Sequence, residues 1–210
     1  IGARLKRLLL QLPYADEMLL LTVPILEWDD PESIPKLDYN AKPSTNTLKS
    51  SALFLIRFSR ITAHTHPFFA DAFDLYAQSF PIHEQRLSKS QQNILSHPQY
   101  HYDAVLEDNT FCGILFSWEI GSLTYIEHFA VSPSLRGQGT GSRILGEFLK
   151  THPLTVLEID PPQDDISIRR EKFYQRLGLV SNDVSHFHPP YRPQTAPHKL
   201  VVMSYPHTLS

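Results

Sequence analysis

Three glycines at alternate positions, Gly137, Gly139 and Gly141, lie in the stretch VSPSLRGQGTGSRILGEFL, between an apolar strand-like run and an amphipathic helix-like run. The first amides of a helix have no intrahelical partner, and the helix dipole makes that end electropositive. Glycine removes the side chains that would hold a ligand away and permits positive φ, so successive amides can converge on one phosphate group. Arg136 adds a full positive charge. The sequence therefore predicts an anion site that binds a phosphate or diphosphate.

Two familiar phosphate-binding patterns fit this loop poorly. A Walker-type loop requires a lysine, and no lysine lies in the loop. A dinucleotide fingerprint reads G-x-G-x-x-G, whereas this chain has G-x-G-x-G followed by Ser142, although Asp160 falls at the expected distance downstream. Only one strand-helix-strand unit surrounds the loop, which disfavours a doubly wound fold. A nicotinamide-dependent oxidoreductase is therefore the weaker alternative.

A third pattern fits better. Arg136, Gly139 and Gly141 form R-x-x-G-x-G after a strand that ends in FAVSP, and FYQRLGL follows at residues 173–179. The loop resembles the acetyl-CoA loop of the GCN5-related N-acetyltransferases (the GNAT family), and the second motif resembles that family's Phe-Tyr-x-x-x-Gly-Phe signature. The resemblance covers about residues 53–207 and the order of elements. It implies transfer of an acetyl group from acetyl-CoA to a primary amine, and a non-catalytic acyl-CoA sensor is the alternative within this fold.

The resemblance also implies where acetyl-CoA binds. The backbone amide of Val131 would polarise the thioester carbonyl, and the amides of the glycine loop would bind the diphosphate. Ser167 and Arg170 stand where the family often has Asn and Ala, and Leu179 stands for its usual Phe. The predicted cofactor-binding residues are Phe129, Ala130, Val131, Arg136, Gly137, Gln138, Gly139, Thr140, Gly141 and Ser142.

Acetyl transfer needs a neutral amine nitrogen, a thioester held nearby and a proton donor for the leaving thiolate. Strand alternation would place Tyr125, Glu127, Phe129 and Val131 on one face. The resemblance implies that Glu127 takes the amine proton and that Tyr174 donates to the coenzyme A sulfur. A phenol with a pKa near 10 is protonated at neutral pH, as this acid must be.

The acceptor site is expected beside the loop HFHPPYRPQTAPHK, which the resemblance places between the last two strands. We expect a small-molecule amine or amino-acid derivative as acceptor, with a homodimer possible. No metal is expected: the histidine pairs at 64/66 and 186/188 lack an accompanying Cys cluster or H-E-x-x-H pattern. The predicted substrate-binding residues are Glu84 and Arg86, at the start of a second helix, with Tyr125, His188 and Tyr191.

These residues need a scaffold, and the pattern predicts an α/β fold: a mixed, splayed sheet of about six to seven strands flanked by helices. A hairpin is expected around Asp108 and Asn109, and Gly178 is expected to close the last helix. Strands are expected at 53–62, 100–108, 110–120, 122–132, 154–160, 184–191 and 199–206, and helices at 66–80, 82–96, after the glycine loop and at 165–178.

Composition narrows the partners and the location. The chain has 210 residues, is 41% hydrophobic and carries a net charge of −3, so a nucleic-acid partner is disfavoured. The single cysteine, Cys112, fits a reducing compartment, and no run approaches the roughly 18 apolar residues of a membrane span. The run LKRLLLQL is too short for a signal peptide. We expect a cytoplasmic protein with an extension or linker at 1–52 and an acetyltransferase domain at 53–207.

Overall fold

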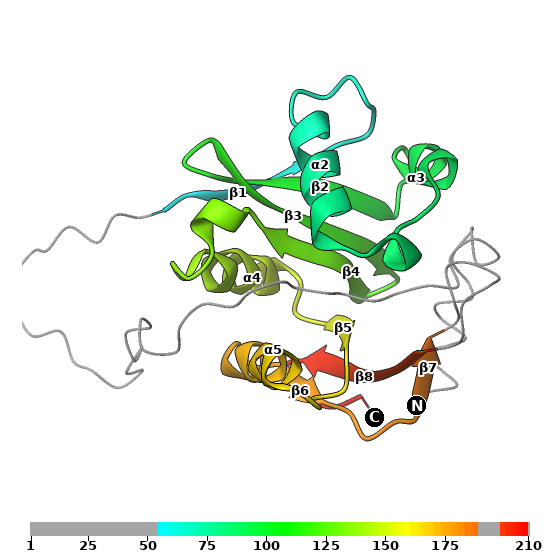
Figure 1. The fold of residues 1–210 in the computed structure, drawn as a ribbon, viewed down its shortest axis with the longest axis vertical. Coiled ribbons are helices and arrows are strands. Elements are labelled where there is room, and N and C mark those ends of the chain that lie inside the picture. The colour runs from blue at the N-terminus through cyan, green and yellow to red at the C-terminus, as the bar shows by residue number, and fades with distance from the viewer. Residues whose placement is uncertain (1–53, 189–197, 210) are drawn as a thin grey trace, which may run out of the picture.

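The computed structural model describes residues 54–188 and 198–209, which form one mixed sheet with helices on both faces (Figure 1). The hydrogen-bonded order is β1-β2-β3-β4-β5-β8-β6, and β7 also pairs with β8. Neighbours are antiparallel except β4 and β5, which are parallel. The strands are β1 (Ile56–Arg60), β2 (Tyr100–Glu107), β3 (Thr110–Ile120), β4 (Leu123–Val131), β5 (Thr155–Ile159), β6 (Val180–Ser181), β7 (His186–His188) and β8 (His198–Tyr205). The predicted fold class is confirmed.

The helices are α2 (Phe69–Ser79), α3 (Ser88–Ile94), α4 (Thr140–Thr151) and α5 (Asp165–Arg176), with two short 3-10 turns, η2 (Ile82–Glu84) and η3 (Pro133–Leu135). The single helix expected over 82–96 is wrong. Gln85 has an extended backbone, and its side chain donates to the Phe80 carbonyl 2.5 Å away. The Arg86 amide donates to the Tyr76 hydroxyl over 2.9 Å. These contacts with α2 replace a helical turn, so Glu84 and Arg86 do not begin α3.

The β2–β3 hairpin forms where the sequence places it. Asp108 and Asn109 both have positive φ, 50° and 65°, as a two-residue turn that matches the twist of the strands requires. Further along β3, a Cβ on Gly113 would lie 2.6 Å from the Ala130 carbonyl oxygen. Glycine at this position therefore allows β3 and β4 to approach each other beneath α4.

The two faces of the sheet carry different helices. On one face, Tyr76 of α2 packs against Phe116 of β3, with ring centroids 5.5 Å apart, and Phe116 stacks on Tyr102 of β2 at 3.8 Å. On the other face, Phe148 of α4 packs against Phe58 of β1 at 5.5 Å. We call these the α2 face and the α4 face. Aromatic packing on both sides fixes the central strands.

The strands β4 and β5 separate soon after they meet. They pair only at Thr124 with Thr155 and at Tyr125 with Val156, although β4 continues to Val131 and β5 to Ile159. Figure 1 shows the two halves of the sheet diverging from this point, with β5, α5 and β8 in the lower half. The predicted splay therefore lies between these two strands, at the end nearest the glycine loop.

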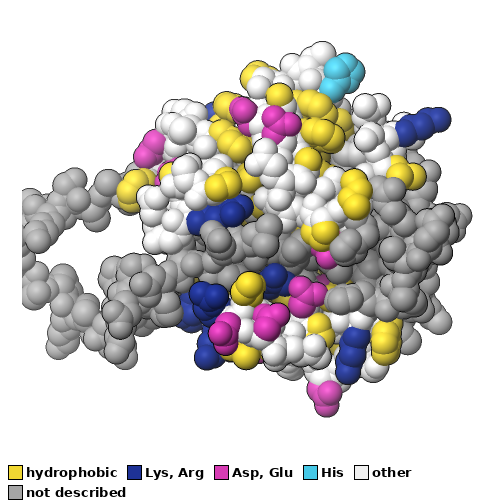
Figure 2. Space-filling view, in the orientation of Figure 1, with side chains coloured by type: hydrophobic (Ala, Val, Ile, Leu, Met, Phe, Trp, Pro, Cys, Tyr) yellow, Lys and Arg dark blue, Asp and Glu magenta, His cyan; other side chains and the backbone are white. Residues whose placement is uncertain are grey.

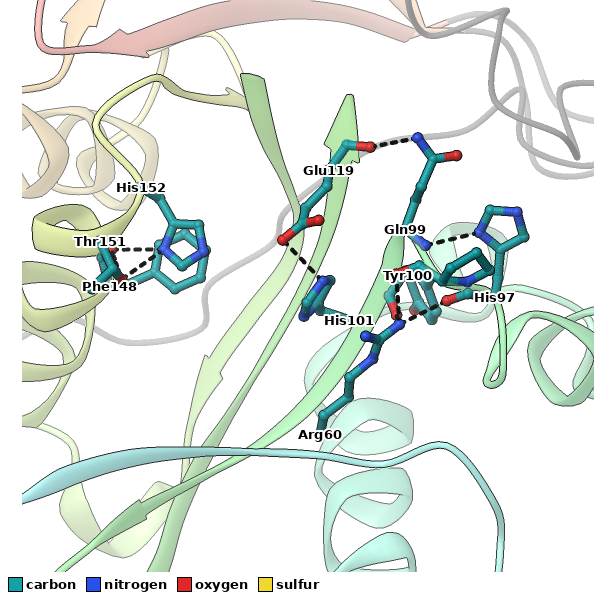
Figure 3. Close-up of polar contacts among 10 residues, drawn as sticks. Arg60, His97, Gln99, Tyr100, His101, Glu119, Phe148, Thr151 and His152 are labelled. Carbon is teal, nitrogen blue, oxygen red and sulfur yellow. Dashed lines mark hydrogen bonds and ion pairs between the residues drawn. The ribbon is translucent and has the colours of Figure 1, made fainter. Parts of the chain in front are cut away.

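A polar cluster ties the sheet together near the C-terminal end of α4 (Figure 3). One nitrogen of Arg60 donates to the carbonyls of His97 and Tyr100 at 2.7 and 2.8 Å. His101 and Glu119 lie 3.2 Å apart across β2 and β3. The cluster holds the start of β2 against its neighbours, at the end of the sheet remote from the glycine loop.

Candidate active site

The glycine loop has the backbone geometry of an anion site. Gly137 and Gly139 have φ of 75° and 74°, a region that other residues rarely adopt. Gly139 is the N-cap of α4, and no side chain caps the helix, so its first amides are not satisfied by a cap. The expectation of positive φ is wrong for Gly141, which is helical and packs near Val131 and Phe173. Two glycines shape the turn and the third lets α4 approach β4 and α5.

Arg143 braces this loop. Its guanidinium forms two hydrogen bonds with the Glu107 carboxylate, at 2.7 and 3.1 Å, and donates to the Gln138 carbonyl at 2.8 Å. It also donates to the Thr140 hydroxyl at 3.0 Å. Sequence reasoning missed Arg143, because its partner Glu107 lies 36 residues away in the chain. The brace fixes the peptide group before Gly139 and thereby the direction of the amides that follow.

Positive charge gathers around the loop. Arg136 donates through Nε to the Val131 carbonyl at 3.1 Å, which joins the loop to the end of β4. Figure 2 shows Lys and Arg side chains over the segment before α4 and over α5. The sequence of α5 contains Arg169, Arg170, Lys172 and Arg176 as well as the acidic Asp165 and Glu171, and Figure 2 shows Asp and Glu side chains over this helix too.

The end of β4 offers main-chain groups to the splay. The Ser132 amide donates to the Cys112 carbonyl at 2.9 Å, which sets the alternation of hydrogen bonds along the β3–β4 pair. By that alternation, the N–H and C=O groups of Phe129 and Val131 point away from β3. They face the side on which β5 has already diverged. An extended ligand could therefore lie along β4 as an added strand would.

A bulge in β4 changes which side chains share a face. Ser117 pairs with Ile126 and Phe116 with His128, so Glu127 is the extra residue. Across this bulge Tyr125 lies on the α2 face, opposite Trp118, whereas Phe129 and Val131 lie on the α4 face, opposite Leu115 and Gly113. The expected alternation of Tyr125, Glu127, Phe129 and Val131 on one face is wrong for this reason.

Glu127 is fully buried on the α2 face. Its Oε1 forms an ion pair with Arg86, and its Oε2 accepts from Trp118 Nε1 at 3.3 Å and lies 3.8 Å from His128 Nδ1. Burial alone would raise the pKa of Glu127, but Arg86 and His128 outweigh it and lower the pKa to about 2. The Arg86 guanidinium also lies over the rings of Tyr100 and Trp118. Glu127 is therefore ionised, and Arg86 is its main counterion.

Tyr174 lies on α5, fully buried. Burial raises the pKa of its phenol, and the charge of Arg170 lowers it in part. The neighbouring Phe173 packs close to Gly141, so this part of α5 lies against the start of α4. The phenol is therefore protonated at every pH at which the protein would be assayed, and it belongs to the same region as the glycine loop.

The two departures from the family pattern have structural roles. Ser167 forms a capping box with Asp164 at the start of α5: its amide donates to Asp164 Oδ1 at 2.7 Å, and its hydroxyl accepts from the Asp164 amide at 3.0 Å. Arg170 donates to Asp160, just beyond β5, at 2.6 Å. Ser167 thereby caps the start of α5, and Arg170 fastens α5 to the end of β5.

The remaining predicted acceptor residues are only partly described. Tyr125 is fully buried on β4, and the Glu84 carbonyl in η2 lies 3.3 Å from His128 Nε2. The side chain of His188 and all of Tyr191 lie outside the described residues.

The structure adds a pair that the sequence analysis did not assign. Glu158 of β5 is fully buried, and His186 of β7 lies 2.8 Å from its Oε1. A glutamate inside the apolar run LTVLEID was the available signal.

Two further features of the described residues bear on other functions. Among residues 54–188 and 198–209, no group of three His, Cys, Asp or Glu side chains is placed to hold a metal ion. Within the same part of the chain, every helix is too short or too polar to span a membrane.

Comparison with known proteins decides the family. The model of the acetyltransferase (GNAT) family matches residues 67–179, more than half of the chain. The chain belongs to the GNAT family. The match begins just before α2 and ends after α5, so it includes the glycine loop, β4 and Tyr174.

Individual proteins similar to this GNAT chain include two that are named as putative acetyltransferases. "Putative acetyltransferase YjbC" of Bacillus subtilis is 26% identical over 106 residues, 50% of this chain and 54% of the relative, so the chain spans about half the length of that curated relative. The structure titled "Putative acetyltransferase from GNAT family from Bacteroides thetaiotaomicron" is 27% identical with a TM-score of 0.70, over 73% of this chain and 88% of that one. Arabidopsis thaliana Naa50 in complex with a bisubstrate analogue has the same fold, at 16% identity and a TM-score of 0.50, over 71% and 97% of the two chains.

Proposed function

We propose that this GNAT chain transfers the acetyl group of acetyl-CoA to a primary amine. The observation that carries the proposal is the uncapped start of α4 beside the splayed end of β4. A diphosphate fits the first and an extended pantetheine arm fits the second, and acetyl-CoA joins these two parts in one molecule.

In this proposal, amides from Gly137 to Ser142 hold the diphosphate, and Arg136 and Arg143 supply charge. Arg143 acts mainly through the loop, because its guanidinium is bound to Glu107 and to the Gln138 carbonyl. The β4 amide of Val131, which points into the splay, would polarise the thioester carbonyl. Acetyl-CoA supplies the activated acyl carbon.

The bond changes follow from the thioester. The lone pair of the amine nitrogen attacks the acyl carbon, a C–N bond forms and the C–S bond breaks. The Tyr174 hydroxyl gives its proton to the leaving sulfur; burial raises the pKa of this phenol, so it is in the protonated form when the thiolate develops.

Glu127 stays the predicted base from the sequence. Its pKa of about 2 keeps the carboxylate ionised but makes it a weak proton acceptor. In the proposal Glu127 also holds Arg86 and the turn after η2 in place. The acceptor is proposed to be a small amine or an amino-acid derivative, as expected from the sequence. A cytoplasmic location and a homodimer stay predictions.

The test is binding and turnover together. Acetyl-CoA at 100 times its dissociation constant should stabilise the fold by about 2.7 kcal/mol, whereas NAD should not. A panel of small amines and short peptides, with thiol release and the acetylated product measured together, should give matched amounts of both. Stabilisation by acetyl-CoA with no turnover on any amine would instead support an acyl-CoA sensor, and stabilisation by NAD alone would support the oxidoreductase.

A further inference from the structure

A second buried carboxylate lies across the splay from Glu127. Tyr125 of β4 and Val156 of β5 form the last pair between the two strands. Glu127 and Glu158 each lie two residues beyond that pair. Directly paired residues share a face and alternate residues return to it, so Glu158 lies on the α2 face, where the Glu127 carboxylate also lies. The two diverging strands thus carry one carboxylate each at the opening.

Glu158 has an unusual set of partners for a fully buried glutamate. Its Oε1 lies 2.8 Å from His186 Nε2, at ion-pair distance, and neither Oε1 nor Oε2 makes a hydrogen bond of good geometry in the described part of the chain. Buried polar atoms in folded proteins are nearly always hydrogen-bonded, so such an atom calls for an explanation. If Glu158 Oε2 accepts a proton from a bound substrate, its lack of a hydrogen bond within the protein is explained.

We propose that Glu158 Oε2 accepts the proton of the attacking amine and that His186 positions the Glu158 carboxylate. The inference rests on the proposed acetyl transfer and names the base for it. As the C–N bond forms, the proton on nitrogen moves to Glu158 Oε2, while Tyr174 protonates the sulfur that leaves as the C–S bond breaks. Both protons and both electron pairs are then accounted for without another reactant.

Glu158 suits this role better than Glu127. Burial raises the pKa of Glu158, and His186 lowers it only in part, whereas Arg86 brings the pKa of Glu127 to about 2. A base whose pKa is nearer the working pH transfers protons more effectively. Glu158 also has a histidine as counterion, which can itself lose a proton, instead of a permanently charged guanidinium.

Among residues 54–188 and 198–209, few other charged groups face Glu158. On β8, the strand paired with β5, the residues that share its face are Leu200, Val202 and Ser204, and none of them titrates in the range of an assay. From β7 it faces His186. From β4, the groups on the same face are Tyr125, Glu127 and His128. Glu127 pairs with Arg86, and His128 contacts the Glu84 carbonyl in η2.

The experiment compares pH profiles of kcat/KM for the full chain, on whichever amine of the panel is acetylated. Glu158→Gln should lower kcat/KM roughly 10²–10⁴-fold and abolish the acidic limb. It should keep its fold, since replacing a buried acid with a raised pKa removes a destabilising charge at neutral pH. His186→Gln removes the group that lowers the pKa of Glu158, so the acidic limb should move to higher pH by about 1–3 units.

A matched control is available in Asp103→Asn. Asp103 is another buried carboxylate, with a pKa raised by burial to about 7, but it lies on the α4 face opposite Leu115. This variant should leave the profile unchanged.

Stabilisation of the fold by acetyl-CoA, measured on every variant, tests acetyl-CoA binding separately from the role of Glu158. Unchanged turnover and an unchanged acidic limb in Glu158→Gln would overturn the role of Glu158 while leaving acetyl transfer intact. Loss of the acidic limb in Glu127→Gln alone would assign the base to Glu127, and a wild-type chain without turnover would overturn both proposals.

Discussion

Glu127→Gln isolates what the buried ion pair contributes to stability. The substitution keeps the shape of the side chain but removes its charge, and it leaves the Arg86 guanidinium buried beside Tyr100 and Trp118. The pKa of Glu127 falls from an ordinary 4.5 to about 2 in the folded protein. At 1.36 kcal/mol per pKa unit, this difference corresponds to about 3 kcal/mol, which agrees with the roughly 3–5 kcal/mol lost when one partner of a buried pair is removed.

The sign of the pH dependence follows from the same shift. Because the folded pKa is depressed, this stability is fully present above pH 4.5 and is lost as the pH falls toward 2. Urea unfolding at pH 7 should therefore show Glu127→Gln to be about 3 kcal/mol less stable than the wild type, and the gap should close as the pH approaches 2.

Two further variants make the result specific to burial. The double variant Arg86→Met, Glu127→Gln should recover most of the loss, since no charge is left buried. Glu147→Gln breaks an exposed pair with Lys150, and it should change the free energy of unfolding by about 0.5 kcal/mol or less. A loss below about 1 kcal/mol in Glu127→Gln, or a gap that does not depend on pH, would refute this reasoning.

Three other predictions address the acetyl-CoA site. Tyr174→Phe should lower kcat about 10²-fold and leave acetyl-CoA affinity unchanged. Tyr102→Phe, a control at another buried tyrosine, should keep wild-type turnover. Equal rates in the two variants would remove Tyr174 from the mechanism. Gly139→Ala should lower the free energy of unfolding in urea by about 1–2 kcal/mol, because the φ of Gly139 is 74°, and it should weaken acetyl-CoA binding. Gly146→Ala, at a helical glycine with open space around it, should raise the free energy of unfolding by about 0.5–1 kcal/mol. The reverse order of stabilities would refute the role of Gly139 in the turn. Arg143→Met should raise the KM for acetyl-CoA with little change in kcat, and an unchanged KM would show that the brace does not shape the loop.

Local patterns predicted most of the scaffold. The β2–β3 hairpin, the splay and the helix after the glycine loop formed as expected, because turn residues and periodicity are properties of neighbouring residues. The helix expected over 82–96 broke because the Arg86 amide bonds the Tyr76 hydroxyl, a tertiary contact that no local pattern contains. For the same reason the short strand β6, which exists only by pairing with β8, was not expected.

The candidate site could likewise be predicted only in part from the sequence. The glycine loop and Tyr174 could be placed from motifs. The environment of Glu127 could not, because a bulge shifts the face of every residue after it and its counterion lies 41 residues earlier. Glu158 and His186 meet only because β5 and β7 both pair with β8. Spacing along the chain identifies groups that could react, and the fold decides which of them share a pocket and what charge each one carries.

The central claim is that main-chain amides at the start of α4 bind the diphosphate of acetyl-CoA. The most direct measurement is a titration of the chain with acetyl-CoA, followed by the amide proton chemical shifts of Gly137 to Ser142. The account predicts large shifts at these amides, which saturate together, and much smaller shifts with a pantetheine thioester that lacks the diphosphate. Saturable binding of acetyl-CoA that leaves these amide signals unmoved would contradict it.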